Sequence, residues 1–202
     1  MGVNAIVFDV DGVLVRAGVF GEILERQYGL DRSRTGAFFQ GPFKECILGR
    51  ADLREALEPF LLEWGWSGSV QDCLDLWFQA DSELNQQMLD VAAALREDGR
   101  RCYVASTQEA CRAAYLEDVL GLASKFDGLF FSCRIGSSKP DRTFFDHTAE
   151  NIGADPNEIL LIDDHELNVE GARAAGWNAE LYLFGDDLDA MLAKYGIEVS
   201  DA

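Results

Sequence analysis

Five short apolar runs, separated by longer segments, constrain the fold of this chain more than any other feature. Helical periodicity follows the second, third and fourth runs, at Cys111–Leu120, Thr143–Ile152 and Leu167–Ala175. Strands that alternate with helices form a parallel sheet with helices on both faces. The sequence therefore predicts an α/β fold with a Rossmann-like, doubly wound parallel sheet, whose strands are Ala5–Phe8, Cys102–Ala105, Leu129–Phe131, Ile159–Ile162 and Leu181–Phe184.

The stretch of residues 16–83 breaks this alternation, because it contains apolar stripes at helical spacing and no convincing strand. One stripe spans Leu53–Trp64 and another spans Val70–Phe78. Pro59 is expected to kink or restart the first of these helices. A third stripe, Leu84–Leu95, leads back towards the sheet. We therefore expect an all-helical domain of residues 16–83, inserted into an α/β core domain formed by residues 1–15 and 84–202.

The overall charge limits the classes of partner. The 202 residues include 36 acidic and 17 basic ones, for a formal net charge of -19. This charge argues against a nucleic-acid partner but is compatible with a small phosphate in a local pocket. The five cysteines are an odd number without C-x-x-C spacing, which indicates reduced thiols.

The sequence offers no sign of a membrane partner. No segment approaches the run of about 18 apolar residues that a membrane helix needs. The first predicted strand begins almost at the N-terminus, which leaves no room for a signal peptide. We expect a cytoplasmic protein that is a monomer or a homodimer, with neither a membrane nor a nucleic acid as partner.

Two acidic residues, Asp9 and Asp11, follow the first predicted strand and precede Gly12. In open α/β sheets, ligands bind just outside the carboxyl ends of the strands, which is where Asp9 falls. The alternative is an Asp-Gly turn that merely closes the strand. The choice between a functional site and a turn depends on whether polar residues also follow the other predicted strands.

Polar residues also follow the next three predicted strands. Ser106 and Thr107 could hold a phosphate oxygen or cap the following helix. Lys139 could offset phosphate charge from its loop, or simply be solvated. Asp163 and Asp164 would repel each other at the end of a buried strand unless a cation lay nearby, and a hard divalent ion such as Mg²⁺ takes such oxygen ligands. A helix cap is the structural alternative for this acidic pair.

In its motifs the chain resembles the haloacid dehalogenase superfamily of hydrolases, and the resemblance covers the whole chain. The inserted helices resemble the family's helical cap, which follows the first strand. Each motif is weak alone, but the order of the four is specific: Asp9-x-Asp11-Gly-Val, Ser106 after an apolar strand, Lys139-Pro140, and Asp163-Asp164 with Asn168.

The resemblance implies that Asp9 is a nucleophile that forms an aspartyl-phosphate. It implies that Asp11 is the general acid for the leaving group and then the base that activates water. It further implies that Mg²⁺ is bound by the Asp9 carboxylate, the backbone carbonyl of Asp11 and Asp164, with Asp163 supporting the metal site.

The phosphoryl group would be held by Ser106 and Lys139, with Thr107 standing where the family often has asparagine. Asp11 and the intact acidic pair favour phosphate chemistry over cleavage of a carbon–halogen bond. The resemblance thus implies a Mg²⁺-dependent phosphatase that acts on a small phosphorylated metabolite. The alternatives are a sugar phosphomutase, a non-catalytic binding protein of the same fold, and a 2-haloacid dehalogenase.

Substrate choice is expected to reside in the helical insert, because the core motifs supply only phosphate and metal contacts. Lys44 and Arg50 could reach a substrate anion, although exposed helical cations usually face solvent. The aromatic residues of the insert, including Phe39 and Trp77, are interpreted as packing residues rather than as a ring-stacking site.

Overall fold

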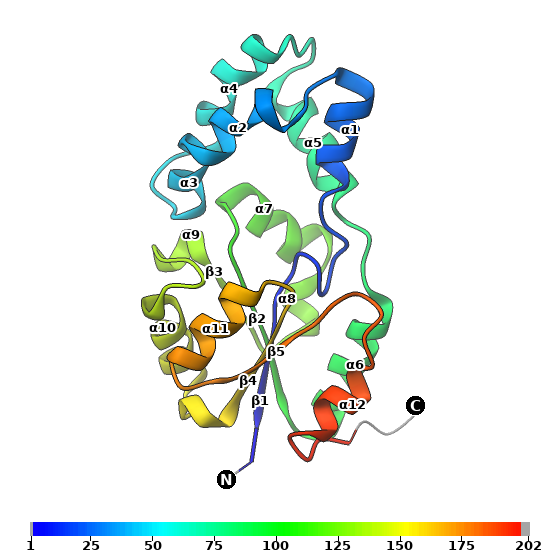
Figure 1. Ribbon diagram of the computed structural model, residues 1–202, viewed down its shortest axis with the longest axis vertical. Coiled ribbons are helices and arrows are strands. Elements are labelled where there is room, and N and C mark those ends of the chain that lie inside the picture. Colours follow the sequence, from blue (N-terminus) through cyan, green and yellow to red (C-terminus); the bar gives the residue numbers. More distant parts are fainter. Residues whose placement is uncertain (1, 199–202) are drawn as a thin grey trace.

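The computed structural model describes residues 2–198, and its centre is a five-stranded parallel sheet (Figure 1). The strands lie in the order β3-β2-β1-β4-β5, so the first strand in sequence is the middle one. Phe8 in β1 is paired with Val104 in β2 and with Ile162 in β4, which aligns the carboxyl ends of these three strands. The strands are β1 (Ala5–Phe8), β2 (Arg101–Ser106), β3 (Gly128–Phe131), β4 (Ile159–Asp163) and β5 (Asn178–Leu181).

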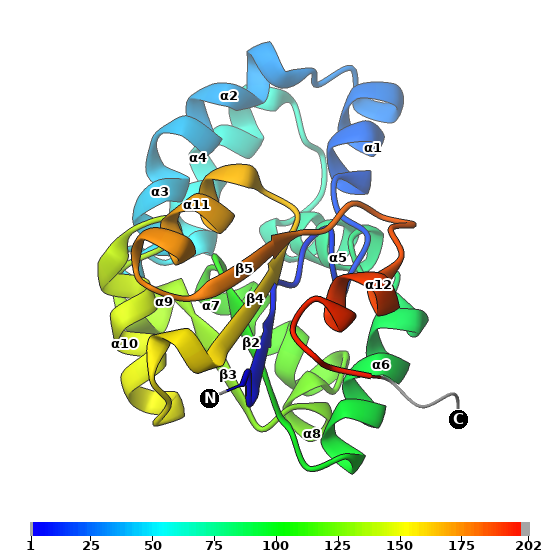
Figure 2. The same ribbon diagram turned by 60° about the horizontal axis from the view of Figure 1, so that its bottom comes forward.

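Helices cover both faces of the sheet, as Figure 2 shows. Alternate strand residues face opposite sides, so Phe8 packs in one core cluster and Val7 in the other. The Phe8 cluster includes residues of α6 (Gln86–Glu97), α8 (Leu122–Lys125) and α12 (Leu188–Ala193). The Val7 cluster includes residues of α10 (Arg142–Ile152) and α11 (Glu166–Ala174). The predicted doubly wound α/β sheet is therefore confirmed.

The last predicted strand is wrong in its position. The structure has β5 at Asn178–Leu181, whereas Leu183 and Phe184 beyond it are 57% and 71% exposed. The chain turns directly after α11 and pairs with β4 from Asn178 onwards, so the strand has ended before the apolar residues that suggested it. At this edge strand, the apolar residues of the sequence do not coincide with the residues that pair in the sheet.

The predicted helix after β2 is divided into two parts. The α-helix α7 spans Ala110–Ala114, and a π-helical segment follows at Tyr115–Val119. Further on, α9 (Ser132–Ile135) follows β3 and precedes the loop that carries Lys139. Within residues 2–198, every helix falls short of the length and apolar character needed to cross a membrane.

Five helices lie above the carboxyl edge of the sheet, and we call them the helical layer (Figure 1). They have a hydrophobic core of their own, separate from the two clusters on the sheet. Two connecting segments join the layer to the sheet, and they are hydrogen-bonded to each other between Arg16 and Glu83 at 2.9 Å. The helices are α1 (Val19–Tyr28), α2 (Arg32–Gln40), α3 (Pro42–Ile47), α4 (Leu53–Trp64) and α5 (Val70–Ala80).

Helix α4 continues through Pro59, so the expected restart of this helix is wrong. Leu57 and Leu61, on either side of the proline, are both buried in the core of the helical layer. Pro59 itself is exposed, as is Glu55, whose carbonyl would accept the missing N–H bond. Water can satisfy that carbonyl, so packing of the opposite face keeps the helix intact.

Candidate active site

Polar side chains from three adjacent strands meet at the carboxyl edge of the sheet. Asp9 follows β1, Ser106 ends β2 and Asp163 ends β4. The backbone N–H of Asp9 donates to the carbonyl of Ile162 at 2.9 Å, which extends the pairing of β1 with β4 up to these acids. The parallel register thus brings together residues that lie far apart in the sequence.

Lys139 joins two of the carboxylates in the buried part of the site. Its Nζ lies 2.9 Å from Asp9 Oδ1 and 2.5 Å from Asp163 Oδ2. All three residues are buried. Burial disfavours the charged amine, but the two carboxylates together outweigh it and raise the pKa of Lys139. Lys139 is therefore a fixed cation rather than the solvated loop residue of the structural alternative.

One ammonium does not offset the negative charge gathered here. Burial is the largest cause that raises the pKa of Asp9 from 3.8 to about 7; Lys139 opposes it, and the negative charges of Asp163 and Asp11 add to it. Burial and Asp163 also raise the pKa of Asp164. The site therefore favours an additional positive charge.

The arrangement of the acids fits a hard divalent cation. Asp9, Asp163 and Asp164 each offer one carboxylate oxygen, and these oxygens all lie within 4.8 Å of one another. Gly12 makes room for this group, because a Cβ at position 12 would lie 2.0 Å from Asp164 Oδ2. A cluster of carboxylate oxygens is the donor set that Mg²⁺ takes in proteins.

Asp163 is the most firmly held of the acids and is fully buried. Besides Lys139, it accepts the backbone N–H of His165 at 2.9 Å and the side-chain amide of Asn168 at 3.0 Å. These contacts fix the Asp163 carboxylate beside Asp9.

Asp11 lies in different surroundings, although it is only two residues from Asp9. Its side chain is 42% exposed and lies 3.9 Å from the guanidinium of Arg112. The side-chain amide of Gln108 donates to Asp11 Oδ2 at 2.8 Å and to Ser106 Oγ at 3.0 Å. Gln108 therefore links the acid after β1 to the hydroxyl that ends β2.

A small cavity of about 240 Å³ lies beside Asp11, and its lining includes Thr107, Gln108, Phe43 and Arg112. Thr107 lines this cavity, whereas Ser106 is buried and its Oγ accepts the side-chain amide of Gln108. The cavity thus has Asp11 and the residues after β2 on its core side and residues of the helical layer on the other.

Sequence reasoning missed the roles of Gln108 and Arg112. The available signal for Gln108 was its position two residues after Ser106. Arg112 is buried and donates to the carbonyls of Phe78, at 3.1 Å, and Asp81, which ties α7 to the end of α5. No local pattern indicates these contacts, because they join segments more than thirty residues apart.

The two cations proposed for substrate contact are exposed on the helical layer. Lys44 and Arg50 both face solvent, and Arg50 lies 3.7 Å from Glu45 in an exposed ion pair. Phe43 and Trp77 are the residues of the layer that line the cavity beside Asp11. Aromatic side chains, rather than Lys44 and Arg50, therefore line this cavity on the side of the helical layer.

Comparison with known proteins identifies relatives of this chain. A family model described as haloacid dehalogenase-like hydrolase matches residues 3–176. The chain is 26% identical over 199 residues to bifunctional epoxide hydrolase 2 of Rattus norvegicus, which covers 87% of this chain and 36% of that protein. It is 28% identical over 92 residues to phosphoglycolate phosphatase of Aquifex aeolicus, covering 46% of this chain and 43% of that protein. The chain thus spans little more than a third of the epoxide hydrolase.

A similar fold is found in a family enzyme from Bacteroides thetaiotaomicron, crystallised in complex with magnesium and inorganic phosphate. The TM-score is 0.80 with 20% sequence identity, over 94% of this chain and 99% of that one. The likeness extends over both the sheet and the helical layer.

Proposed function

The chain belongs to the haloacid dehalogenase-like hydrolase family, and we propose that it is a Mg²⁺-dependent phosphatase that hydrolyses a small phosphorylated metabolite through an aspartyl-phosphate. The observation that carries this proposal is the buried contact of Lys139 with Asp9 and Asp163, next to Asp164. A phosphoryl group that meets the Asp9 carboxylate would therefore also lie beside the fixed positive charge of Lys139.

Asp9 is the nucleophile in this proposal. Its Oδ1 accepts the backbone N–H of Val10 at 2.7 Å and contacts Lys139 at 2.9 Å. These contacts hold the carboxylate in place and leave Oδ2 as the oxygen that attacks phosphorus. The phosphorus–oxygen bond to the leaving alcohol breaks as the bond to Oδ2 forms, which gives the aspartyl-phosphate.

Asp9, Asp163 and Asp164 would hold Mg²⁺, and the backbone carbonyl of Asp11 would add a further oxygen ligand. The ion would supply positive charge to the three carboxylates and to the phosphoryl oxygens. Lys139 supplies positive charge from the protein itself. The magnesium and phosphate named for the Bacteroides relative support this assignment.

Asp11 moves the protons in this proposal. It donates a proton to the oxygen of the leaving alcohol and then takes one from the water that hydrolyses the aspartyl-phosphate. Gln108 and Arg112 orient its carboxylate towards the cavity that Thr107 also lines. Ser106 and Thr107 supply hydroxyls to the phosphoryl oxygens. The relative named phosphoglycolate phosphatase supports this reaction class.

Phosphate release from a panel of phosphomonoesters, with and without Mg²⁺, tests the proposal. Asp9→Asn is expected to abolish turnover, because an amide does not attack phosphorus. Asp118→Asn, the same change at an exposed position outside the site, is the matched control. Full activity in Asp9→Asn would refute the mechanism. Slow phosphate release together with turnover primed by a sugar bisphosphate would favour the phosphomutase instead.

A further inference from the structure

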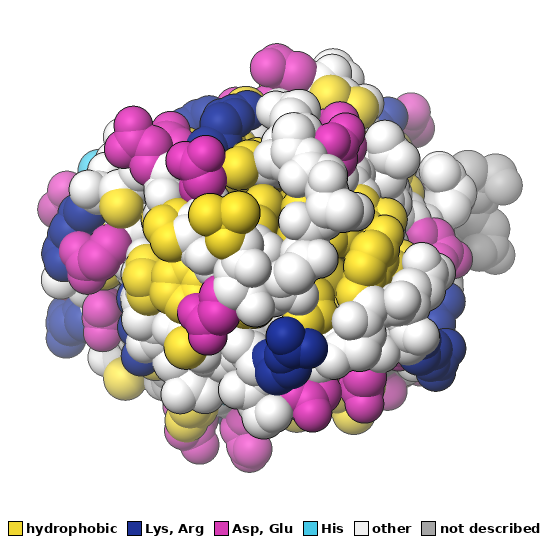
Figure 3. Space-filling view, turned by 90° about the horizontal axis from the view of Figure 1, so that it is seen from above, with side chains coloured by type: hydrophobic (Ala, Val, Ile, Leu, Met, Phe, Trp, Pro, Cys, Tyr) yellow, Lys and Arg dark blue, Asp and Glu magenta, His cyan; other side chains and the backbone are white. Residues whose placement is uncertain are grey.

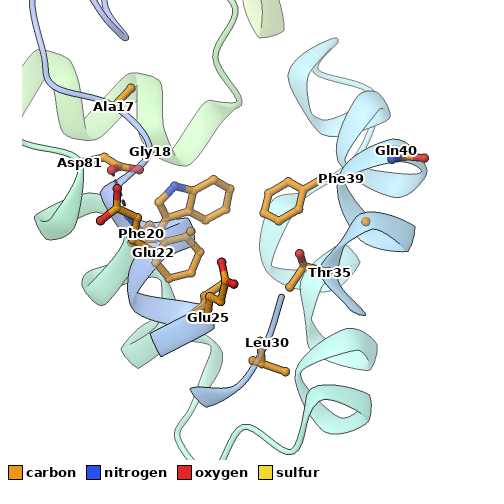
Figure 4. Close-up of a pocket in the computed structure, with 14 residues that line it drawn as sticks. Ala17, Gly18, Phe20, Glu22, Glu25, Leu30, Thr35, Phe39, Gln40 and Asp81 are labelled. Atoms are coloured by element: carbon orange, nitrogen blue, oxygen red, sulfur yellow. Dashed lines mark hydrogen bonds between the residues drawn. The ribbon is translucent and has the colours of Figure 1, made fainter. Parts of the chain in front are cut away.

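A larger cavity, of about 540 Å³, lies inside the helical layer between α1, α2 and α5 (Figure 4). Aromatic rings form much of its wall. Trp77 stacks on Phe20 at 5.1 Å and meets Phe39 nearly edge-on at 5.7 Å. Figure 4 places Phe20 and Phe39 on opposite sides of the space and Leu30 at its far end. The volume is within the range of cavities that bury a ligand of drug size.

This cavity adjoins the smaller one beside Asp11. Four residues, Ala17, Gly18, Trp77 and Asp81, line both. Figure 4 shows Ala17, Gly18 and Asp81 together at one end of the larger cavity. The shared lining places the aromatic residues next to the cavity beside Asp11, which is where the leaving group of a molecule with its phosphate near Asp11 would need to lie.

The charged side chains that line the larger cavity are all acidic. Asp81 accepts the backbone N–H groups that begin α1, at 2.8 and 3.2 Å. Glu22 forms an exposed ion pair with Arg26 at 3.6 Å, and Glu25 is exposed. Figure 3, the view from above, shows hydrophobic side chains in the middle of this face of the molecule and both acidic and basic ones around them. A second negative charge on a substrate would be repelled here.

From this geometry we infer that the larger cavity takes the leaving group, and that it selects phosphomonoesters of bulky apolar alcohols without a further negative charge. The inference rests on the proposed phosphatase function. The phosphate of the substrate contacts Lys139. The described lining of the larger cavity contains no such cation, so the substrate carries its negative charge at the phosphate end only. The alcohol packs against Trp77 and Phe39, where burial of apolar surface provides the binding free energy.

Size selection is tested with two alkyl esters that have similar leaving groups, 2-(2-naphthyl)ethyl phosphate and ethyl phosphate. The wild-type chain with Mg²⁺ is expected to prefer the naphthyl ester by at least about tenfold in kcat/KM. Trp77→Ala should lower this preference about tenfold. Ala17→Phe places a bulky side chain at an exposed position that borders both cavities, and it should also lower the preference for the naphthyl ester. This second variant keeps the test valid if Trp77→Ala fails to fold.

Charge selection is tested with 4-carbamoylbenzyl and 4-carboxybenzyl phosphates, which have nearly the same size. The wild-type chain should prefer the uncharged carbamoyl ester. Glu25→Lys should reduce this preference about fivefold, as expected for an exposed charge. Glu63→Lys makes the same charge change at an exposed position of α4 and should leave the preference unchanged. Equal effects of the two variants would show that only the net charge matters and would overturn the charge argument.

Binding of 2-(2-naphthyl)ethanol, measured by calorimetry, separates this inference from the proposed function. Wild-type protein should bind the alcohol, and Trp77→Ala should bind it about tenfold more weakly. Lack of binding by the wild type overturns the cavity assignment, whatever the turnover. If alcohol binds as expected but no ester releases phosphate in a Mg²⁺- and Asp9-dependent reaction, the proposed function fails and with it the role of the cavity as a leaving-group site.

Discussion

Asp9 should destabilise the metal-free protein at neutral and alkaline pH. The residue Asp9 is 6% exposed, and the pKa of its carboxyl is raised from 3.8 to about 7, mainly by burial. The unfolded chain therefore releases this proton near pH 3.8, but the folded chain releases it only near pH 7. Between these values the folded state binds the extra proton, so the free energy of unfolding decreases as the pH rises.

The size of this effect follows from the two pKa values. They differ by about 3, and each pKa unit corresponds to about 1.4 kcal/mol, which gives a loss of about 4 kcal/mol across the window. Asp9→Asn removes the titration and keeps an oxygen that can accept from Val10 and Lys139. Without metal, the variant should therefore equal or exceed the wild type in stability at pH 8, and lose that advantage near pH 4.

Urea unfolding in the presence of a chelator, at pH 4 and pH 8, measures the difference. Added Mg²⁺ should raise the unfolding free energy of the wild type at pH 8 more than that of Asp9→Asn, because binding to the folded state stabilises it. If Asp9→Asn lowers stability by the same amount at both pH values, the conclusion that burial of the charged Asp9 carboxylate destabilises the protein is refuted.

Three further substitutions test the site. Lys139→Met leaves two buried carboxylates without their cation and should cost about 3–5 kcal/mol of stability at pH 7, measured by urea unfolding. Gln108→Ala removes the hydrogen bond to Asp11, the proposed general acid, and should lower kcat about tenfold with little change in KM, in steady-state assays. Gly12→Ala should weaken Mg²⁺ binding in calorimetry by displacing Asp164, whereas Gly136→Ala, which has a similar positive φ with open space around it, should lose stability but retain Mg²⁺ affinity. Unchanged Mg²⁺ affinity in Gly12→Ala would contradict the placement of the metal.

The sequence was sufficient to predict the central strands and the acids that follow them. β1 and β4 are buried on both faces, so they are continuous apolar runs that end abruptly in Asp9 and Asp163. The position of β5 was not predicted correctly, because β5 is an edge strand and Phe184 beyond it is apolar but exposed. Periodicity reports which residues could be buried, but it does not say where pairing stops.

The remaining parts of the site depend on packing between distant segments. Arg112 is placed by carbonyls at the end of α5, and Gln108 by Asp11, which lies 97 residues before it. Trp77 belongs to the apolar stripe of α5, and the same helical spacing describes a core residue and the wall of a cavity equally well. Its position in the wall follows only from how α1 and α2 pack around it.

The two interpretations of the first motif, a turn or a functional site, describe one feature of this molecule. A turn is present, since the N–H of Val13 donates to the carbonyl of Val10 at 3.2 Å and Gly12 has a φ of +82°. That backbone conformation and the lack of a side chain let the Asp164 carboxylate lie where a Cβ would otherwise be. The turn is therefore what allows an acid from β4 to reach the acid from β1, so its geometry is required by the chemistry proposed for the site.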